Sequence, residues 1–320
     1  MELSTPGGRV QAALAGACIG LTMACAGAAA QQEAAPLPMT GLGDGAYVFF
    51  GAQQDATPAN QGAIANVGFV IGERCVAVID TGGSRIEGGR LLAAVRAVTD
   101  RPVCAVINTH MHPDHVYGNA AFLPERPDFI GHVHLAAALA ARSATYARSL
   151  ERTLGDGAGA TPLVPPTRSV DPAAPYELDL GGHSLQVQAW PTAHTDNDVT
   201  VFDARSRTLW AGDLLFAGRI PVVDGSLAGW LQVEDRIEQM QPLRVIPGHG
   251  PADDWHAALA AQRRYLQALA QDTRAAIRAH RSMIQAVEDV AAGERGKWLL
   301  FDEYHRRNIA AAYAELEWED

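Results

Sequence analysis

The sequence predicts an α/β fold in which strand–helix units follow one another along the chain. Short apolar runs bounded by glycine, such as residues 75–80, have the composition of buried strands. Residues 85–98 instead repeat apolar side chains at helical spacing. The candidate functional residues follow the strand-like runs, which is where α/β proteins place their sites.

The N-terminal half is predicted to contain more strands than helices. It opens with a lead-in rich in Ala, Pro and Gly over residues 31–44, which we expect to be exposed. Apolar and β-branched runs predict strands at residues 46–50, 63–71, 75–80, 103–107 and 129–131. Helices are predicted at 85–98 and about 135–154, followed by a Gly/Pro-rich loop at 155–166.

The C-terminal half is predicted to contain five more strands and then helices. The strands are expected at residues 176–180, 184–189, 199–203, 208–211 and 243–247. Residues 216–230 are interpreted as a long loop. From Trp255 to Trp318 the pattern is helical almost throughout, with breaks near Gly293 and Gly296.

Composition restricts the class of partner. The 320 residues are 48% hydrophobic and 19% charged, which is enough apolar material for a large buried core. The net charge of −11 and the lack of a Lys/Arg cluster argue against a nucleic-acid surface. We therefore expect a small-molecule substrate, and the sequence identifies no partner protein.

Residues 1–30 differ in kind from the rest of the chain. Val10 to Ala30 is nearly uncharged, rich in Ala, Gly and Leu, and ends in three alanines. An apolar stretch that ends in small residues is typical of a secretory signal peptide, here cleaved near Ala30. The sequence thus predicts a periplasmic protein with no membrane span after cleavage. An uncleaved membrane anchor is the alternative.

Cleavage would leave two of the four cysteines, Cys75 and Cys104. Each opens an apolar strand-like run, and two such strands separated by about one helix usually lie side by side and parallel. The two sulfurs could then form a disulfide in an oxidising compartment. A pair of buried free thiols is equally compatible with the sequence.

The most informative motif is Thr109-His110-Met111-His112-Pro113-Asp114-His115. Imidazole and carboxylate are the ligands that zinc, manganese and iron accept where no thiolate is offered. His110 and His112 can face one ion, and Asp114 and His115 can then turn toward a second.

Three isolated residues downstream complete a two-metal site. His194 is expected as the third ligand of the first ion and His249 as the third ligand of the second. Asp213 is expected to bridge, because a carboxylate can offer one oxygen to each ion. Each ion would then keep an open position for water.

These motifs resemble those of the metallo-β-lactamase superfamily. The run from His110 to His115 is similar to its His-x-His-x-Asp-His signature, and Asp80-Thr81-Gly82 to an early family segment. The segments around His194 and His249 also match, and Asp213 resembles the bridging Asp of the glyoxalase II branch. The resemblance implies a four-layer αββα sandwich over residues 31–252, followed by a helical extension over 253–320.

A narrower resemblance concerns residues 119–122, 219–230 and 313–318. They look like the exported zinc metallohydrolases associated with quinoprotein-dependent oxidation (the quinoprotein relay system) and with sulfur oxidation. The resemblance implies a hydrolase with two zinc ions, for which iron or manganese are the alternatives. A metal-bridged hydroxide would cleave an ester, thioester, lactone or amide, with Asp114 as a catalytic proton acceptor.

Other functions stay open at this point. A mononuclear iron enzyme of the persulfide dioxygenase type would share nearly the same ligands. A β-lactamase is a further alternative, although true β-lactamases lack a bridging carboxylate such as Asp213. A binding protein with a degenerate site is disfavoured by the full ligand set.

Several supporting roles are expected nearby. Asp80 and Asn197 would orient ligand imidazoles, with turn chemistry as the alternative. Arg219 and Asp224 would contact substrate and Trp230 would wall the site, with packing roles as the alternative. His132 and His134 are spaced like a ligand pair, but no carboxylate follows them. We therefore expect them at a helix start or on the surface.

Overall fold

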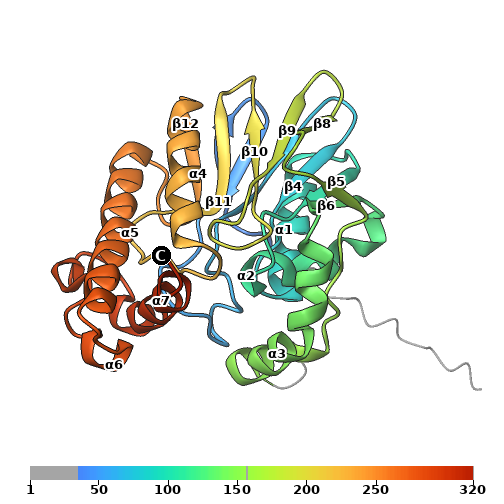
Figure 1. The fold of residues 1–320 in the computed structure, drawn as a ribbon. Coiled ribbons are helices and arrows are strands. Elements are labelled where there is room, and N and C mark those ends of the chain that lie inside the picture. The colour runs from blue at the N-terminus through green and yellow to red at the C-terminus, as the bar shows by residue number, and fades with distance from the viewer. Residues whose placement is uncertain (1–34, 156–157, 320) are drawn as a thin grey trace, which may run out of the picture. The chain divides into compact units, whose positions relative to one another are not determined.

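The computed structural model describes residues 35–155 and 158–319, which belong to one compact unit, Ala34–Asp320. The predicted signal peptide at 1–30 lies outside the described residues. Two sheets stand face to face with helices on their outer sides (Figure 1). None of the helices in the described ranges has the length and apolarity needed to cross a membrane.

The first sheet contains seven strands in sequential order. Its antiparallel half becomes parallel from β4 onward. The strands are β1 (Thr40–Gly43), β2 (Ala46–Phe49), β3 (Val67–Ile71), β4 (Val76–Ile79), β5 (Val103–Ile107), β6 (Asp128–His132) and β7 (Arg168–Val170).

The second sheet contains five strands in the order β12-β11-β10-β9-β8. Its strands pair antiparallel except for the parallel pair β11–β12. They are β8 (Tyr176–Asp179), β9 (Ser184–Ala189), β10 (Val199–Asp203), β11 (Thr208–Phe216) and β12 (Arg244–His249).

Helices cover the outer face of each sheet. The α-helices are α1 (Arg85–Val98), α2 (Pro113–Val116), α3 (Leu135–Leu154), α4 (Leu227–Gln239), α5 (Trp255–Arg278), α6 (Met283–Ala286) and α7 (Phe301–Leu316). Short 3-10 helices lie at η1 (Tyr117–Glu125), η2 (Ala158–Ala160) and η3 (Ala292–Glu294).

Three apolar clusters show how the layers are held together. Between the sheets, Val70 and Ile79 pack in one cluster with Val201. On the outer side of the first sheet, Leu91 of α1 packs against that sheet. A third cluster joins the second sheet to α4, α5 and α7. The arrangement confirms the predicted αββα sandwich.

The helices after residue 252 share their core with the second sheet. Gln262 of α5 accepts a hydrogen bond from the backbone of Phe216 (2.8 Å). Asn308 of α7 binds both the carbonyl of Pro221 (2.7 Å) and the amide of Val223 (3.0 Å). These helices therefore act as part of the outer layer and also fix the loop after β11.

Residues 216–230 are not one long loop, so that prediction was wrong. Strand β11 continues through Phe216 with all nine residues buried, and α4 begins at Leu227. The start of α4 is capped by the hydroxyl of Ser226 and by the carboxylate of Glu315, which accepts hydrogen bonds from the first α4 amides. Because Glu315 comes from α7, a local pattern could not show this cap.

Three other segments also differ from the sequence predictions. Residues 63–66 form a turn before β3, where the Asn66 side chain binds the backbone of Gly51, Pro247 and Gly250. The predicted lead-in contains β1, which pairs with β2. Strand β7 had no recognisable pattern; it adds a short edge to β6.

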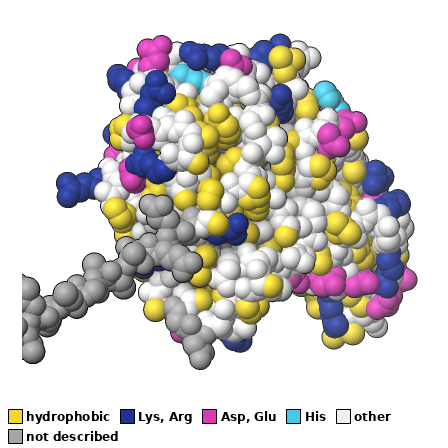
Figure 2. Space-filling view, turned by 180° about the vertical axis from the view of Figure 1, so that it is seen from behind, with side chains coloured by type: hydrophobic (Ala, Val, Ile, Leu, Met, Phe, Trp, Pro, Cys, Tyr) yellow, Lys and Arg dark blue, Asp and Glu magenta, His cyan; other side chains and the backbone are white. Residues whose placement is uncertain are grey.

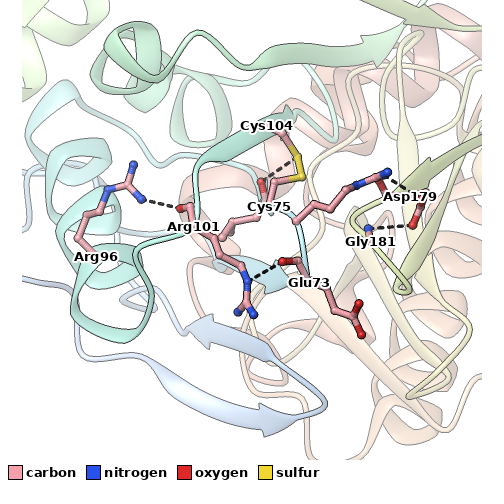
Figure 3. Close-up of a disulfide and its surroundings, with 9 residues drawn as sticks. Glu73, Cys75, Arg96, Arg101, Cys104, Asp179 and Gly181 are labelled. Atoms are coloured by element: carbon pink, nitrogen blue, oxygen red, sulfur yellow. Dashed lines mark hydrogen bonds and ion pairs between the residues drawn. A yellow bond between two sulfur atoms is a disulfide. The ribbon is translucent and has the colours of Figure 1, made fainter.

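Cys75 and Cys104 form a disulfide (Figure 3), which settles the alternative that the sequence left open. Cys104 lies in β5 and Cys75 directly precedes β4, its parallel neighbour, so the bridge joins the strands near their amino ends. Arg101 donates to the backbone of Glu73 beside it (2.9 Å). The bridge spans 29 positions of sequence.

Replacing both cysteines by alanine should lower the free energy of unfolding by about 3 kcal/mol, because the open loop gains entropy in the unfolded chain. Urea unfolding of the variant and the wild type measures the difference. Wild type unfolded under reducing conditions is the control and should match the variant. An unchanged urea midpoint would contradict a stabilising role.

Candidate metal centre

The predicted ligands meet where the carboxyl ends of strands from both sheets face each other. The segment His110–His115 follows β5 and runs into α2. His194 lies in the turn between β9 and β10, Asp213 lies within β11, and His249 ends β12. Residues far apart in sequence are thus brought to one edge of the sandwich.

All seven predicted ligands fall into two groups that could hold metal ions. One group contains His110, His112, His194 and Asp213, and the other contains Asp114, His115 and His249. Within each group the candidate ligand atoms lie within 4.8 Å of one another. Apart from Asp213, which was expected to bridge and is here grouped with the first set, the residues divide as the sequence analysis expected.

The carboxylate of Asp213 lies between the two groups. Its Oδ2 is 3.4 Å from Nε2 of His194 and 3.7 Å from Nε2 of His110. Its Oδ1 is 3.1 Å from Nε2 of His115 and 3.4 Å from Nε2 of His249. One oxygen therefore faces each group, which is the geometry that a bridging ligand needs.

In two of the candidate ligand rings, the nitrogen that faces away from the other ligands is bound by a backbone carbonyl. His194 Nδ1 donates to the carbonyl of Val222 (2.7 Å), and His249 Nδ1 donates to that of Ile64 (2.8 Å). A ring that donates through one nitrogen presents a lone pair on the other. These contacts therefore prepare Nε2 of both rings for a metal ion.

Asp80 controls one imidazole in each group. Its Oδ2 binds Nδ1 of His115 (2.7 Å) and the hydroxyl of Thr109 (2.7 Å). That hydroxyl lies 3.1 Å from Nδ1 of His110 and can accept its proton. The expected role of Asp80 as an orienting residue agrees with this geometry. The relay through Thr109 was not foreseen, although Thr109 stands next to the motif.

His112 is oriented differently from the other four rings. Its Nδ1 faces the first group, 3.0 Å from Nε2 of both His110 and His194. Its Nε2 is bound by Asp224 Oδ2 at 2.9 Å. Asp224 was expected either to contact substrate or to have a packing role; in the structure it binds the His112 ring, and it also pairs with Arg142 (3.0 Å).

Some expected neighbours lie elsewhere. The Asn197 side chain donates to Asp196 (2.7 Å) and binds no ligand imidazole, which matches the alternative turn role. Trp230 is fully buried and packs against the ring of His194, so it supports a ligand and does not line the cavity. His132 is buried and binds the Trp190 carbonyl, while His134 precedes α3 as its N-cap residue.

Backbone geometry permits the close approach of β11 and β12 at the site. A Cβ atom on Gly248 would lie 1.9 Å from Oδ1 of Asp213. Gly212 has a φ of +52° and faces Thr109. Larger residues at either position would displace Asp213 or the orienting Thr109.

The charges around the site match a bound cation. Burial alone would raise the pKa of Asp213, but His249, His115 and His110 hold it well below its usual value. Burial lowers the pKa of His194 to about 3, so that ring is neutral. Burial would also lower the pKa of His115, yet Asp213, Asp80 and Asp114 raise it well above its usual value.

Buried atoms without partners show that the residues fit metal ions. Among the described residues, Nε2 of His115 and Oδ1 of Asp213 are buried and have no hydrogen-bond partner. The two atoms lie 3.1 Å apart and belong to different groups, and the carboxylates nearby favour positive charge at this place. A divalent ion would satisfy them, and imidazole with carboxylate is a ligand set that zinc, iron or manganese accepts.

A cavity of about 620 Å³ opens onto this centre. His112, Asp114, Asp213 and His249 contribute to its lining. Arg219, predicted to face substrate, lines it as well. Tyr146 and Arg142 of α3 and Tyr304 and Arg307 of α7 were missed, because only the tertiary fold brings those helices to the cavity.

The chain belongs to the metallo-β-lactamase superfamily. The profile of the "Metallo-beta-lactamase superfamily" matches residues 61–249, more than half of the chain and the segment with all seven candidate ligands. Members of this superfamily are mostly metal-dependent hydrolases, although it also includes other enzyme types.

Solved structures show the same fold. A metallo-beta-lactamase from Pontibacter korlensis is 20% identical, with a TM-score of 0.58, and covers 72% of this chain and 99% of its own. One from Hirschia baltica is 17% identical, with a TM-score of 0.57, and covers 72% and 97%. At these identities the likeness concerns the fold alone.

A curated relative matches a short segment. It is a linear primary-alkylsulfatase of Pseudomonas sp. (strain ATCC 19151), 38% identical over 58 residues. The match covers 18% of this chain and 11% of that protein, so the matched segment spans about a tenth of the relative's length.

Replacing Asp80 by alanine should weaken metal binding 10- to 100-fold, because His115 and His110 lose the carboxylate that orients them. Chelator competition against zinc measures the change. Asp128→Ala is the matched control: Asp128 is exposed at the start of β6 and should leave affinity unchanged. Equal affinity in the two variants would contradict an orienting role.

Proposed function

We propose that this protein is an exported hydrolase that uses two divalent ions, zinc foremost, to cleave an ester, thioester, lactone or amide. The observation that carries the proposal is the Asp213 carboxylate, whose two oxygens face two separate ligand groups. Membership of a mainly hydrolytic superfamily supports it. A mononuclear site would not require this shared carboxylate.

Two ions held in this way would lower the pKa of a shared water and polarise a substrate carbonyl. The side chains of this protein would hold the two ions and fix their positions. His110, His112 and His194 would hold the first ion, and Asp114, His115 and His249 the second, with Asp213 common to both. The contacts behind the imidazoles keep these atoms in place, so little reorganisation is needed during the reaction.

Asp114 is the best placed proton acceptor. It lines the cavity and its side chain is 18% exposed, against 4% for Asp213. Burial would raise its pKa, but His115 and His249 hold the pKa below its usual value, so the carboxylate is ionised. Because it is ionised, one oxygen is free to receive a proton from the reacting group while the other serves as ligand, although the lowered pKa makes it a weak base.

We also propose that the protein works in the periplasm, after cleavage near Ala30, and serves a quinoprotein or sulfur-oxidation system. The Cys75–Cys104 disulfide supports an oxidising compartment, since such bonds are rare in the cytosol. The system is suggested by the narrower sequence resemblance. N-terminal sequencing of the periplasmic protein tests the export step.

Asp213→Ala should reduce the metal content from about two ions per chain to about one and abolish hydrolysis, because the ions lose their shared ligand. Elemental analysis of purified protein measures the content. Asp235→Ala, an exposed substitution on α4, is the matched control and should keep two ions and full activity. Two ions and normal turnover in the Asp213 variant would refute the bridging role.

A substrate panel tests the reaction class. The panel should contain chromogenic esters, thioesters, lactones and β-lactams, together with an alkyl sulfate because of the matched alkylsulfatase segment. We expect turnover that is lost on chelation and shows no initial burst, because no side chain carries an acyl group. Oxygen consumption with a persulfide substrate would instead favour the iron dioxygenase hypothesis.

A further inference from the structure

The side chains of Gln262 on α5 and Glu234 on α4 are polar and yet completely buried. On the face shown in Figure 2, by contrast, basic and acidic side chains are interspersed at the surface. A buried amide or carboxylate is costly unless its hydrogen bonds are satisfied, and glutamate is almost never fully buried without a partner. The contacts of these two side chains therefore show what keeps them in the interior.

Gln262 uses both polar atoms of its amide. Its Oε1 accepts from the backbone N–H of Phe216 (2.8 Å), and its Nε2 donates to the backbone carbonyl of Leu214 (2.8 Å). The second proton of Nε2 goes to Oε1 of Glu234 (2.9 Å). These partners permit one orientation of the amide, because a flipped amide would set donor against donor and acceptor against acceptor.

The backbone groups that Gln262 binds lie in an irregular stretch of β11. Between Gly212 and Phe216, four steps along β11 match two steps along β12. The pairing of β11 with its other neighbour, β10, ends at Trp210. Residues 213–215 therefore form a bulge, in which backbone groups leave the regular ladder. Buried backbone groups of this kind need other partners, and Gln262 supplies them from the neighbouring layer.

The bulge connects the two groups of candidate metal ligands. Asp213 is its first residue, and one carboxylate oxygen of Asp213 lies near each group. Phe216 follows the bulge. Its ring packs against His194 of the first group (5.7 Å between ring centres) and stacks on His249 of the second (5.1 Å). Gln262 binds the backbone between these two side chains, so it acts where both groups meet.

Helices α4 and α5 hold the same carbonyl. Nε1 of Trp230, on α4, also donates to the carbonyl of Leu214 (3.0 Å). Gln262 itself lies beyond residues 61–249, the segment that the superfamily profile matches. The support of the bulge therefore comes partly from the C-terminal helices.

We propose that Gln262, oriented by Glu234, is a positioning residue for the metal centre, because it holds the β11 bulge in the shape in which the Asp213 carboxylate can serve both ions. The inference rests on the two-ion centre of the proposed function. Without Gln262 the bulge loses hydrogen bonds on both sides of Leu215. Asp213 and Phe216 can then turn relative to the imidazoles that they contact.

Manganese loading tests this role without turnover. Two Mn²⁺ ions that share a bridging ligand are exchange-coupled, and electron paramagnetic resonance distinguishes the coupled pair from isolated ions. Gln262→Met keeps the length of the side chain but loses its hydrogen bonds. We expect this variant to bind the second equivalent of Mn²⁺ about tenfold more weakly, as on the loss of other groups that orient metal ligands. Most of the coupled signal should be replaced by that of isolated ions.

Leu269→Ala is the matched control for stability. Leu269 is fully buried in the same apolar cluster, about two turns further along α5. The substitution should lower the urea midpoint of unfolding, because it leaves a cavity, but keep the coupled signal. An equal fall of the coupled signal in Leu269→Ala and Gln262→Met would overturn the proposal, since general destabilisation would then explain both.

Glu234 offers variants that leave Gln262 in place. Glu234→Leu removes the acceptor that orients the Gln262 amide, and it should lower the coupled signal less than Gln262→Met does. Glu234→Gln keeps an acceptor at this position and should restore most of the signal lost in Glu234→Leu. If Gln262→Met does not fold, an undiminished coupled signal in Glu234→Leu would overturn the proposal.

The spectra separate this inference from the proposed function. A coupled signal that depends on Gln262, while every substrate stays inert, would support the positioning role and refute the hydrolase. Coupled signals of equal size in wild type and Gln262→Met would overturn the positioning role alone. Isolated ions in the wild type would refute both, because no shared carboxylate would then join the ions.

Discussion

The ionised carboxylate of Asp213 is buried between imidazole nitrogens from four rings, and this placement constrains the elements around it. Its two oxygens serve two groups, so β11 must approach β5, β12 and the turn before β10 closely. Glycine at 248 is needed because any side chain there would meet Oδ1. Such a carboxylate is tolerated in a buried site only when cations neutralise it. The fold and the expected metals therefore depend on one another.

Two carboxylates and two backbone carbonyls orient all five candidate ligand imidazoles. Asp80 holds His115 directly and His110 through Thr109, so one carboxylate links both metal groups. Asp224 holds His112 and at the same time pairs with Arg142 at the cavity. Backbone carbonyls hold the remaining two rings. Ligand geometry is consequently tied to β4, to the loop after β11 and to the cavity wall on α3.

Local patterns were enough to predict an α/β fold and to gather the candidate ligands, while the sandwich was implied by the family resemblance. His110 to His115 form one compact motif, and His249 directly follows an apolar strand, so both could be located without tertiary information. The sequence carried a local signal for α4 that was missed, since Ser226 is its N-cap and Leu227, Trp230 and Ile237 recur at helical spacing; only the added cap by Glu315 from a distant helix had no local pattern. For Asn197 two roles were left open, and its contact with Asp196 fits the turn role. Carbonyl partners such as Val222 have no side-chain signature at all.

The hydrogen bonds of Asn308 connect helix α7 to one of the candidate metal ligands. Asn308 binds the backbone on both sides of Val222, and the Val222 carbonyl orients His194. The last helix of the chain thus fixes a group on which a ligand for the first ion depends. A variant that lacks α7 would therefore lose the support for the carbonyl that orients His194 as well as the part of the cavity wall formed by Tyr304 and Arg307.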